Sequence, residues 1–323
     1  MAKIFVTRPI PEAGIKALRS KGYEVVVNEK AENRAATKEE LLEGIKGADA
    51  ILSILTEKID AEVMDAGLPT LKIIANYAVG FDNIDLEAAK KNGLMVTNTP
   101  GVLTDTVAEH TFALMLSIAH RISEADRFTR AGRYKAWGPN LLLGTDISGK
   151  TLGIVGLGRI GSRVAHHAFN GFEMKILYND VKPNSEFEKE FGAQYVEKLD
   201  DLLPHCDFVS IHVPLLDSTR HLINDARLKI MKRSAYLINT SRGPIIDEKA
   251  LANALTQGFI RGAAIDVFEF EPEIVPELKT LDNVIITPHI ASATEETRNK
   301  MAEMAAQNII DALEGRTPPN LVK

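Results

Sequence analysis

The chain has 323 residues, of which 45% are apolar and 25% charged, a composition that excludes a wholly disordered protein. This length is more than one simple hydrophobic core usually supports and suits two domains. The balance of 38 Lys and Arg against 44 Asp and Glu gives a net charge of −6, which argues against nucleic acid or an anionic membrane as the main partner. Cys206 is the only cysteine, so an intrachain disulfide and a cysteine-based zinc cluster are both excluded.

The amino terminus predicts no targeting segment. Residues 1–7 run directly into a strand-like pattern without the apolar core of a signal peptide. The longest clean apolar runs, such as 112–119, are far shorter than a membrane span. We therefore expect a cytoplasmic protein without a membrane partner.

Short β-branched runs alternate with helical patterns in the first hundred residues. The pattern predicts strands at 4–6, 25–27, 51–55 and 71–75 and helices at 11–21 and 38–46. Apolar strands that alternate with helices indicate a parallel sheet covered on both faces. The turn after the first strand, residues 7–11, has prolines where a phosphate-binding turn has glycines, so this part is expected to hold substrate rather than nucleotide.

A long helix is predicted over 104–130, followed by an irregular surface loop over 132–149 that carries the only tryptophan, Trp137. The alternation then resumes, with strands predicted at 151–155, 175–178, 208–212, 236–239, 263–267 and 284–286. A last helix is predicted over 295–313, ended by Gly315 and two prolines. The expected fold class is α/β, with two doubly wound parallel-sheet domains.

The strand predicted at 151–155 leads directly into Gly156-Leu-Gly158-Arg-Ile-Gly161, and a helical pattern follows. In such a turn the first glycine permits a tight bend, the second lets the backbone approach a pyrophosphate, and the third lets helix and strand pack closely. Amide groups at the start of the helix attract phosphates. This strand–turn–helix unit predicts a dinucleotide site; glycines that only shape a turn are the alternative reading.

Asp180, at the end of the next predicted strand, is the candidate that sets cofactor choice. A carboxylate there can accept hydrogen bonds from both ribose hydroxyls and repels a 2′-phosphate, so NAD(H) is the expected cofactor and NADP(H) the alternative. Asp180 lies 24 residues after Gly156, beyond the usual spacing of about 20. An exposed aspartate at a strand end is therefore the competing interpretation.

Three titratable side chains follow three separate predicted strands: Arg242, Glu271 and His289. The carboxyl ends of parallel strands open onto the ligand crevice of such sheets, so the fold could gather them there. A guanidinium pairs with a substrate carboxylate and polarises a carbonyl, while an imidazole held by a carboxylate exchanges a proton near neutral pH. The set suits reduction of a 2-oxo acid beside a nicotinamide. Taken singly, each residue also has an ordinary structural explanation.

Histidines at 110, 120, 166, 167, 205 and 221 have no carboxylate or cysteine partner at ligand spacing, so they are interpreted as structural or solvated and no metal site is expected.

Longer blocks around these residues resemble a known family. Residues 239–244 (NTSRGP), 264–272 (AIDVFEFEP) and 287–294 (TPHIASAT) are similar to signature blocks of the D-isomer-specific 2-hydroxyacid dehydrogenases. Residues 76–85 (NYAVGFDNID) and 149–156 also match, so the resemblance covers essentially the whole chain. Within that family the sequence most resembles the glyoxylate/hydroxypyruvate reductases, also called glycerate dehydrogenases.

The resemblance implies a role for each matching residue. Arg242 would bind the carboxylate and carbonyl of the substrate, and His289 would donate the proton in reduction with Glu271 as its partner. Asp266 would orient the nicotinamide carboxamide. The implied substrate-binding residues are Leu52, Ser53, Ala78, Val79, Gly80, Arg242 and Trp137, the last reaching the partner subunit's pocket in some relatives. The implied cofactor-binding residues are Thr106, Gly156, Gly158, Arg159, Ile160, Gly161, Asp180, His212, Val213, Pro214, Thr219, Thr240, Ser241, Asp266, His289 and Ala291.

The resemblance also implies a domain organisation. A flavodoxin-like substrate domain would comprise residues 1–99 and 291–323, with a Rossmann-type dinucleotide-binding domain, residues 100–290, inserted between them, in an enzyme that forms a homodimer. The implied activity is NAD(H)-dependent reduction of glyoxylate or hydroxypyruvate to the D-2-hydroxy acid. Alternatives are another dehydrogenase of the family, acting on D-lactate, phosphoglycerate or phosphite, and an NADH-sensing corepressor.

Two departures from the family pattern bear on these expectations. Ala291 stands where many relatives have glycine, which adds a methyl group near the nicotinamide edge. One extra residue falls around 169–173, before the strand that ends at Asp180, and this bears on cofactor preference.

Overall fold

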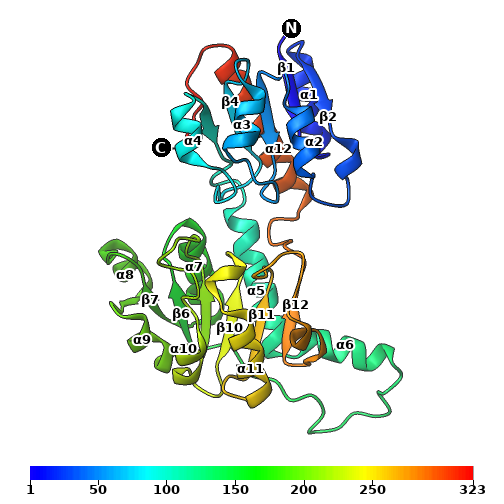
Figure 1. Cartoon of the computed structure of the whole chain (residues 1–323). Coiled ribbons are helices and arrows are strands. Elements are labelled where there is room, and N and C mark those ends of the chain that lie inside the picture. Colours follow the sequence, from blue (N-terminus) through cyan, green and yellow to red (C-terminus); the bar gives the residue numbers. More distant parts are fainter. Residues whose placement is uncertain (323) are drawn as a thin grey trace. The chain divides into compact units, whose positions relative to one another are not determined.

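The computed structural model describes residues 1–322 (Figure 1). The chain forms two compact units. Unit 1 comprises Met1–Leu103 and the segment that starts at Ala293, and unit 2 comprises Thr104–Ser292, inserted between them in sequence. The units divide at 103/104 and 292/293, a few residues after the expected domain boundaries. The assignment of a substrate role and a dinucleotide role to these parts stays a prediction at this point.

Unit 1 is built on a parallel sheet with the strand order β2-β1-β3-β4-β5. The strands are β1 (Lys3–Val6), β2 (Glu24–Val27), β3 (Ala50–Ser53), β4 (Ile73–Asn76) and β5 (Met95–Thr97). This order is typical of flavodoxin-like folds. Every residue of β3 and β4 is buried, which explains why these strands read as unbroken apolar runs.

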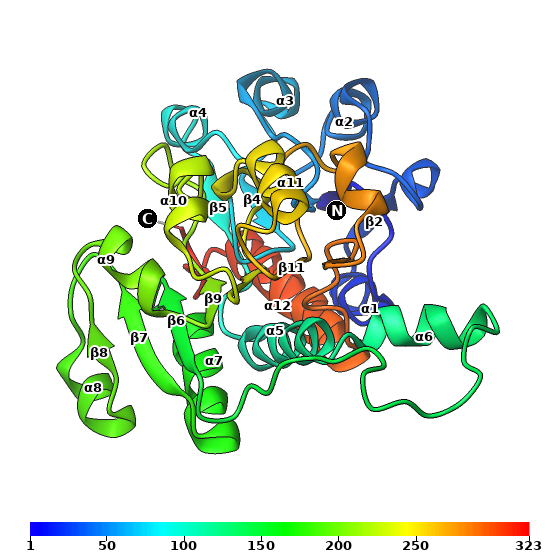
Figure 2. The same ribbon diagram turned by 90° about the horizontal axis from the view of Figure 1, so that it is seen from below.

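Helices cover both faces of this sheet (Figures 1 and 2). On one face lie α1 (Glu12–Ser20) and α12 (Glu295–Leu313), and on the other lie α2 (Lys38–Gly44), α3 (Ala61–Gly67) and α4 (Leu86–Lys91). The contact of α1 with α12 is close, because a Cβ added at Gly14 would lie 2.6 Å from the carbonyl oxygen of Ala302. This contact ties the carboxy-terminal segment to the amino-terminal sheet.

Unit 2 contains a second parallel sheet, with the order β12-β11-β10-β9-β6-β7-β8. Its strands are β6 (Thr151–Val155), β7 (Lys175–Asn179), β8 (Gln194–Tyr195), β9 (Phe208–Ile211), β10 (Tyr236–Asn239), β11 (Gly262–Ile265) and β12 (Val284–Ile286). Counted from β6, this is the Rossmann order with one further strand, and its topological switch point lies between β6 and β9. The predicted α/β class with two doubly wound parallel sheets is confirmed.

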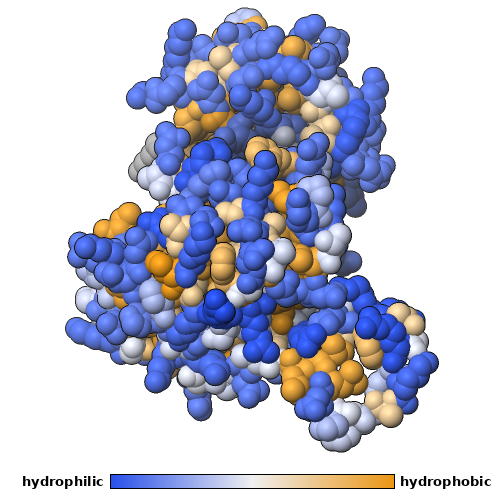
Figure 3. All heavy atoms as spheres, turned by 60° about the horizontal axis from the view of Figure 1, so that its bottom comes forward, coloured by the Kyte–Doolittle hydropathy of each residue, from blue (hydrophilic) through white to orange (hydrophobic). Residues whose placement is uncertain are grey.

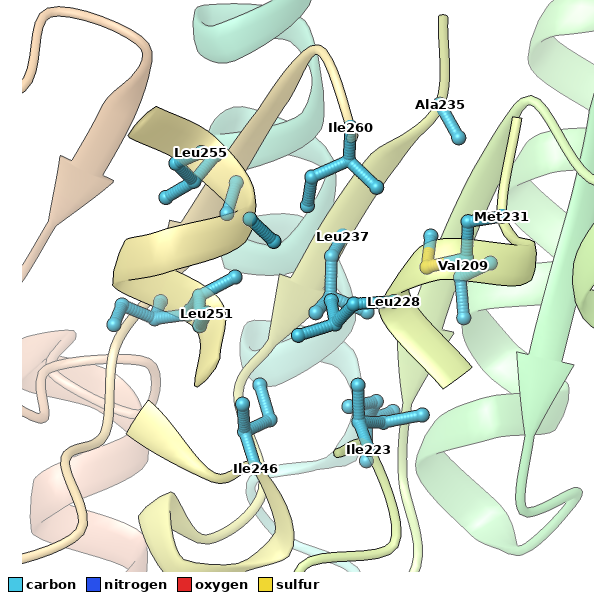
Figure 4. Packing of buried hydrophobic residues seen from close by; sticks show 14 of the residues in the cluster. Val209, Ile223, Leu228, Met231, Ala235, Leu237, Ile246, Leu251, Leu255 and Ile260 are labelled. Carbon is cyan, nitrogen blue, oxygen red and sulfur yellow. The ribbon is translucent and has the colours of Figure 1, made fainter. Parts of the chain in front are cut away.

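The faces of this sheet are covered by different helices (Figure 2). On one face lie α5 (Thr104–Ala119) and α7 (Arg159–Phe172), and on the other lie α10 (Asp225–Ile230) and α11 (Glu248–Gln257). Figure 4 shows the core under α10 and α11, where Leu228, Leu237 and Leu251 lie together. The shorter helices α8 (Ser185–Phe191) and α9 (Leu199–Leu202) flank β8 in sequence. This core fixes the strands whose ends carry the candidate site.

The single helix predicted over 104–130 is wrong, because two helices occupy this segment. After α5 ends at Ala119, Arg121 adopts a left-handed conformation with φ of 56°, and α6 (Ile122–Arg130) starts in a new direction. The carbonyl of Ala119 accepts a hydrogen bond of 2.8 Å from the amide of Thr145, within the usual range for such bonds. A returning loop therefore occupies the acceptor that a continuous helix would use.

Most other predicted elements are confirmed within a few residues. The helix predicted over 295–313 has those bounds as α12, and residues 132–149 contain neither helix nor strand. The short strands β5 and β8 were not predicted, since a run of two or three residues carries little periodicity. In the described part of the chain, 1–322, every helix is too short or too polar to cross a membrane.

Candidate active site

The glycine turn after β6 has the geometry that its sequence predicts. Gly156 has φ of +95°, and a Cβ there would lie 2.9 Å from the backbone of His212 and Val213. A Cβ at Gly161 would lie 2.1 Å from the carbonyl oxygen of Gly156. At Gly158, the N-cap of α7, a Cβ would have no neighbour among residues 1–322 within 4 Å. The fold thus requires the first and third glycines, while the second faces the open space that a pyrophosphate needs.

Asp180 lies at this turn. It directly follows β7, and its carboxylate accepts hydrogen bonds from the amides of Leu157 and Val181, each 2.6 Å long. The 24 residues from Gly156 to Asp180 include α7, which continues to Phe172 and ends at Glu173 in a left-handed conformation. The hydrogen bond from Leu157 places the carboxylate beside the glycine turn despite this longer connection. Together these residues fit a dinucleotide, with its phosphates at the start of α7.

The loop after β9 closes the other side of the turn. The amide of His212 donates to the carbonyl of Val155 at 2.7 Å, and its Nε2 lies 2.8 Å from the hydroxyl of Ser210. Burial lowers the pKa of His212 to about 3, so its ring is uncharged at neutral pH. The Thr219 hydroxyl donates to the carbonyl of Pro214 at 2.7 Å and fixes the rest of this loop. These residues can line a groove, and His212 is unsuited to act as an acid.

The remaining residues implied in cofactor binding lie on neighbouring elements of unit 2. Thr106 is in the first turn of α5, and Arg159 and Ile160 begin α7. The hydroxyl of Thr240 lies 3.0 Å from that of Thr111, and the Ser241 hydroxyl donates to the carbonyl of Val213. The loop after β10 is thus tied to the loop after β9, across the neighbouring strands.

Arg242 is held by the end of β10. The side-chain nitrogen of Asn239 donates to the carbonyl of Arg242 at 2.9 Å, and the side-chain oxygen of Asn239 accepts from the amide of Ser241 at 3.0 Å. The next residue, Gly243, touches the loop after β11, because a Cβ there would lie 1.8 Å from the carbonyl oxygen of Phe268. The loops that carry Arg242 and Glu271 are therefore in direct backbone contact.

His289 and Glu271 form the predicted pair. Nδ1 of His289 lies 2.9 Å from a carboxylate oxygen of Glu271, and the side chains are 24% and 28% exposed. The other oxygen of Glu271 accepts a hydrogen bond from the amide of Phe268 at 3.0 Å. His289 has φ of 56°, a conformation rare for residues other than glycine and frequent where function fixes a side chain. Because Nδ1 faces Glu271, Nε2 is the nitrogen that can serve a substrate.

Asp266 holds the backbone around His289. Its fully buried carboxylate accepts hydrogen bonds from the Thr287 hydroxyl at 2.6 Å and from the amides of Ile290 and Ala291 at 2.9 and 2.7 Å. Burial by itself would raise the pKa of Asp266. The hydrogen bonds from His110, Thr287 and the two amides have a larger, opposite effect, so the pKa is lower than its ordinary value. In this structure the carboxylate serves the turn that carries His289, and its contact with a nicotinamide carboxamide stays a prediction.

The candidate substrate residues of unit 1 lie at the ends of β3 and β4. Ser53 donates to the side-chain oxygen of Asn76 at 3.0 Å, and Asn76 in turn donates to the carbonyl of Gly80 at 2.9 Å. The carbonyls of Val79 and Ala78 accept from the side chain of Asn98 and the amide of Thr99, both at 2.8 Å. With its carbonyls held in this way, the 78–80 turn can direct its amides to an anion.

For two of the predicted substrate-binding residues, Leu52 and Trp137, the structure shows no side chain placed to contact a substrate. Leu52 is fully buried within β3, so only its main chain could meet a ligand. Trp137 is 80% exposed on the loop after α6, so the described residues, 1–322, leave most of its side chain uncovered. Its implied contact with a partner subunit stays a prediction.

Asn76 and His110 were missed as site residues. Asn76 is the first residue of the matching block 76–85. A polar amide side chain at the end of a predicted apolar strand is the feature that could have identified it. His110 was interpreted as structural, yet its Nε2 lies 3.7 Å from the carboxylate of Asp266, a pairing between a helix and a distant strand end that spacing along the chain does not reveal. Among residues 1–322, no cluster of three His, Cys, Asp or Glu side chains could hold a metal ion.

Comparison with known proteins identifies the family. The family profile described as "D-isomer specific 2-hydroxyacid dehydrogenase, NAD binding domain" matches residues 112–291. The chain belongs to the D-isomer specific 2-hydroxyacid dehydrogenase family. The matched part is the family's NAD binding domain, so the chain uses a nicotinamide cofactor, and the predicted family is confirmed.

Individual proteins and solved structures are similar to this chain over nearly its full length. A glyoxylate reductase from Korarchaeum cryptofilum is 50% identical, covering 99% of this chain and 95% of the relative. A crystal structure of a Thermus thermophilus protein is similar with a TM-score of 0.93 and 44% identity, covering 99% and 100% of the two chains. An NADPH-dependent glyoxylate/hydroxypyruvate reductase from Sinorhizobium meliloti has a TM-score of 0.85 and 31% identity, covering 100% and 98%.

Proposed function

We propose that this dehydrogenase reduces glyoxylate or hydroxypyruvate, with NADH, to the 2-hydroxy acid, of D configuration where a stereocentre forms. The observation that carries the proposal is the His289–Glu271 pair, in which Nδ1 lies 2.9 Å from a carboxylate oxygen. Both residues follow strands of the same parallel sheet as the glycine turn and Arg242. The full-length similarity to a glyoxylate reductase supports the substrate class.

The residues of unit 2 divide the chemistry among them. When bound, a reduced nicotinamide would supply the hydride for the carbonyl carbon of the substrate. Nε2 of His289 gives a proton to the carbonyl oxygen, so that hydride and proton together convert C=O to CH–OH. Glu271 holds the ring by Nδ1, which leaves Nε2 for the substrate. The guanidinium of Arg242 pairs with the substrate carboxylate and polarises the carbonyl.

The 78–80 turn of unit 1 is a carboxylate-binding element in this proposal, acting through its main-chain amides. Its support is the engagement of the three turn carbonyls, with Asn76 linking Gly80 to Ser53. A turn fixed by its carbonyls presents N–H groups with little loss of entropy when an anion binds.

NAD(H) is the preferred cofactor in this proposal, because the Asp180 carboxylate lies at the glycine turn, where it would meet the adenosine ribose. A 2′-phosphate beside this carboxylate would meet like charge. The relative from Sinorhizobium meliloti is NADPH-dependent, and in this proposal Asp180 is the side chain that makes the present chain prefer NADH.

The proposed assembly is a homodimer in the cytoplasm. Figure 3 shows a group of orange, apolar spheres on the surface of unit 2. The large side chains exposed on α6 and the loop after it are Ile122, Tyr134, Trp137, Leu141 and Leu143. Burial of such a segment against a second copy would remove apolar surface from water. A dimer would also give Trp137 a partner surface.

The proposed location in the cytoplasm has a separate support. A single, buried cysteine, Cys206, fits a reducing compartment.

The test is a steady-state assay of NADH oxidation with glyoxylate, hydroxypyruvate, pyruvate and phosphohydroxypyruvate at equal concentrations. The proposal predicts the highest kcat/KM with one of the first two. A preference for pyruvate or phosphohydroxypyruvate would reassign the enzyme within its family. Binding of NADH without turnover of any 2-oxo acid would instead favour a dinucleotide-sensing protein.

A further inference from the structure

Glu248 is a buried carboxylate that the site described above does not use. It is the first residue of α11 and only 3% exposed. Asp247 before it is the N-cap and accepts the amide of Ala250 at 3.0 Å, so Glu248 is not needed to cap the helix. Its two oxygens accept hydrogen bonds from the amides of Glu269 and Val275, both 2.7 Å long. These two amides lie on either side of Glu271 in the chain.

A second pair of contacts holds the same loop, residues 268–275. One oxygen of Glu269 lies 2.6 Å from Nε2 of His221, and the other accepts from the amide of Glu248 at 3.3 Å. The middle of the loop has no apolar anchor, since Phe270 is 64% exposed and residues 271–273 are also exposed. Phe268 packs in the core at one end, Ile274 and Val275 pack against it at the other, and the polar contacts fix the main chain between these anchors on both sides of Glu271.

We propose that Glu248 is a positioning residue for reduction, acting through the 268–275 loop to keep Glu271 at hydrogen-bonding distance from His289. This inference rests on the proposed function. The residue type fits the task, because a carboxylate can accept with both oxygens, whereas a glutamine accepts with one and places an NH2 group against the second amide. The loop would then lose one of the two hydrogen bonds that Glu248 accepts from it, and Glu271 would leave its place beside Nδ1 of His289.

The test compares Glu248→Gln with the unaltered enzyme in glyoxylate reduction. A shift of about 1 Å in a catalytic group can cost about a hundredfold in rate, so we expect kcat to fall by about 10- to 100-fold. The KM for NADH should stay within about twofold, because the glycine turn follows a different strand. Glu277→Gln, at an exposed carboxylate just beyond the same loop, makes the same change of charge and should leave both constants unaltered.

Two further variants distinguish positioning from a general loss of folding. In a Glu271→Gln background, Glu248→Gln should lower kcat by less than about twofold, because its effect passes through Glu271. His221→Ala, at a side chain that is 40% exposed and so tolerates truncation, should lower kcat several-fold with the KM for NADH unchanged.

Each outcome is decisive. Normal kcat in both Glu248→Gln and His221→Ala, with an active unaltered enzyme, would overturn this inference alone. An equal loss from Glu248→Gln with and without Glu271 would also overturn it, since Glu248 would then act elsewhere. Absence of turnover in the unaltered enzyme would overturn the proposed function and this inference together.

Discussion

At the residue scale, two carboxylates beside His289 have different tasks. Asp266 is fully buried and accepts two amides and a hydroxyl from the turn on which His289 stands. Glu271 is partly exposed and contacts the imidazole itself. The first fixes the backbone in its left-handed conformation, and the second fixes the ring. Substitution of either should therefore lower activity, but only the first should strongly change stability.

Asp266→Asn should show this in the pH dependence of stability. Since the pKa of Asp266 is lower in the folded protein than its ordinary value of about 3.9, the ionised carboxylate stabilises the fold above that pH, and this contribution is lost as the pH falls through the lower, folded value. We expect the variant to lose about 1–3 kcal/mol at pH 7. The loss should shrink toward pH 3 in urea unfolding. A difference between the two proteins that does not change with pH would contradict this assignment.

Asp180→Ala should change the choice of cofactor. Removal of the carboxylate deletes hydrogen bonds to the ribose hydroxyls and the repulsion of a 2′-phosphate, so the ratio of kcat/KM with NADH to that with NADPH should fall about 10- to 100-fold. Glu186→Ala, at an exposed carboxylate in the first turn of α8, is the control and should leave the ratio unchanged. An unaltered ratio in Asp180→Ala would place the determinant elsewhere.

Much of this residue chemistry could be predicted because it follows from strand order. Arg242, Glu271 and His289 each follow a parallel strand, and such strands end at one edge of the sheet. The roles of Glu248 and Asn76 could not be predicted in this way. A glutamate in the first turn of a helix ordinarily interacts with the helix dipole, and only the three-dimensional structure shows that Glu248 reaches across to another loop.

At the scale of elements, the β6–turn–α7 unit depends on one close approach. Gly161→Ala places a Cβ 2.1 Å from the carbonyl oxygen of Gly156, so the helix has to move away from the turn. We expect a loss of about 1–3 kcal/mol in stability and a weaker affinity for NADH, measured by thermal unfolding and fluorescence titration.

The same helix contains the matched control for this prediction. Gly171 lies in the last turns of α7, and among the described residues no atom lies within 4 Å of the position its Cβ would take. Gly171→Ala should therefore stabilise the protein by about 0.5–1 kcal/mol and leave NADH affinity unchanged. Equal behaviour of the two variants would refute the close approach at Gly161.

Elements also show where local pattern is sufficient and where it fails. The bounds of α12 follow from Thr294 as N-cap and from its helical periodicity, both local properties. The break between α5 and α6 is decided by Thr145, which reaches the carbonyl of Ala119 from a loop that starts after Arg130. The helical pattern of residues 104–130 carries no information about a contact with Thr145, so it predicts a single helix.

At the scale of the whole molecule, the exposed apolar segment around α6 predicts the oligomeric state. Leu141→Asp would place a charge in the proposed dimer interface, and we expect it to convert the dimer to monomer in sedimentation velocity at micromolar concentration. Ile230→Asp is the matched control, because Leu141 and Ile230 are both 40% exposed and Ile230 lies on α10. Dissociation by both variants, or by neither, would argue against this interface.

The proposed reduction depends on His289 as the proton donor, and the decisive measurement is kcat for glyoxylate reduction by His289→Gln at saturating NADH. The proposed mechanism predicts a fall of about 10²- to 10⁴-fold, while the Kd of NADH stays within about twofold of the unaltered enzyme. A kcat within threefold of the unaltered enzyme would contradict it, because some other group would then have to supply the proton.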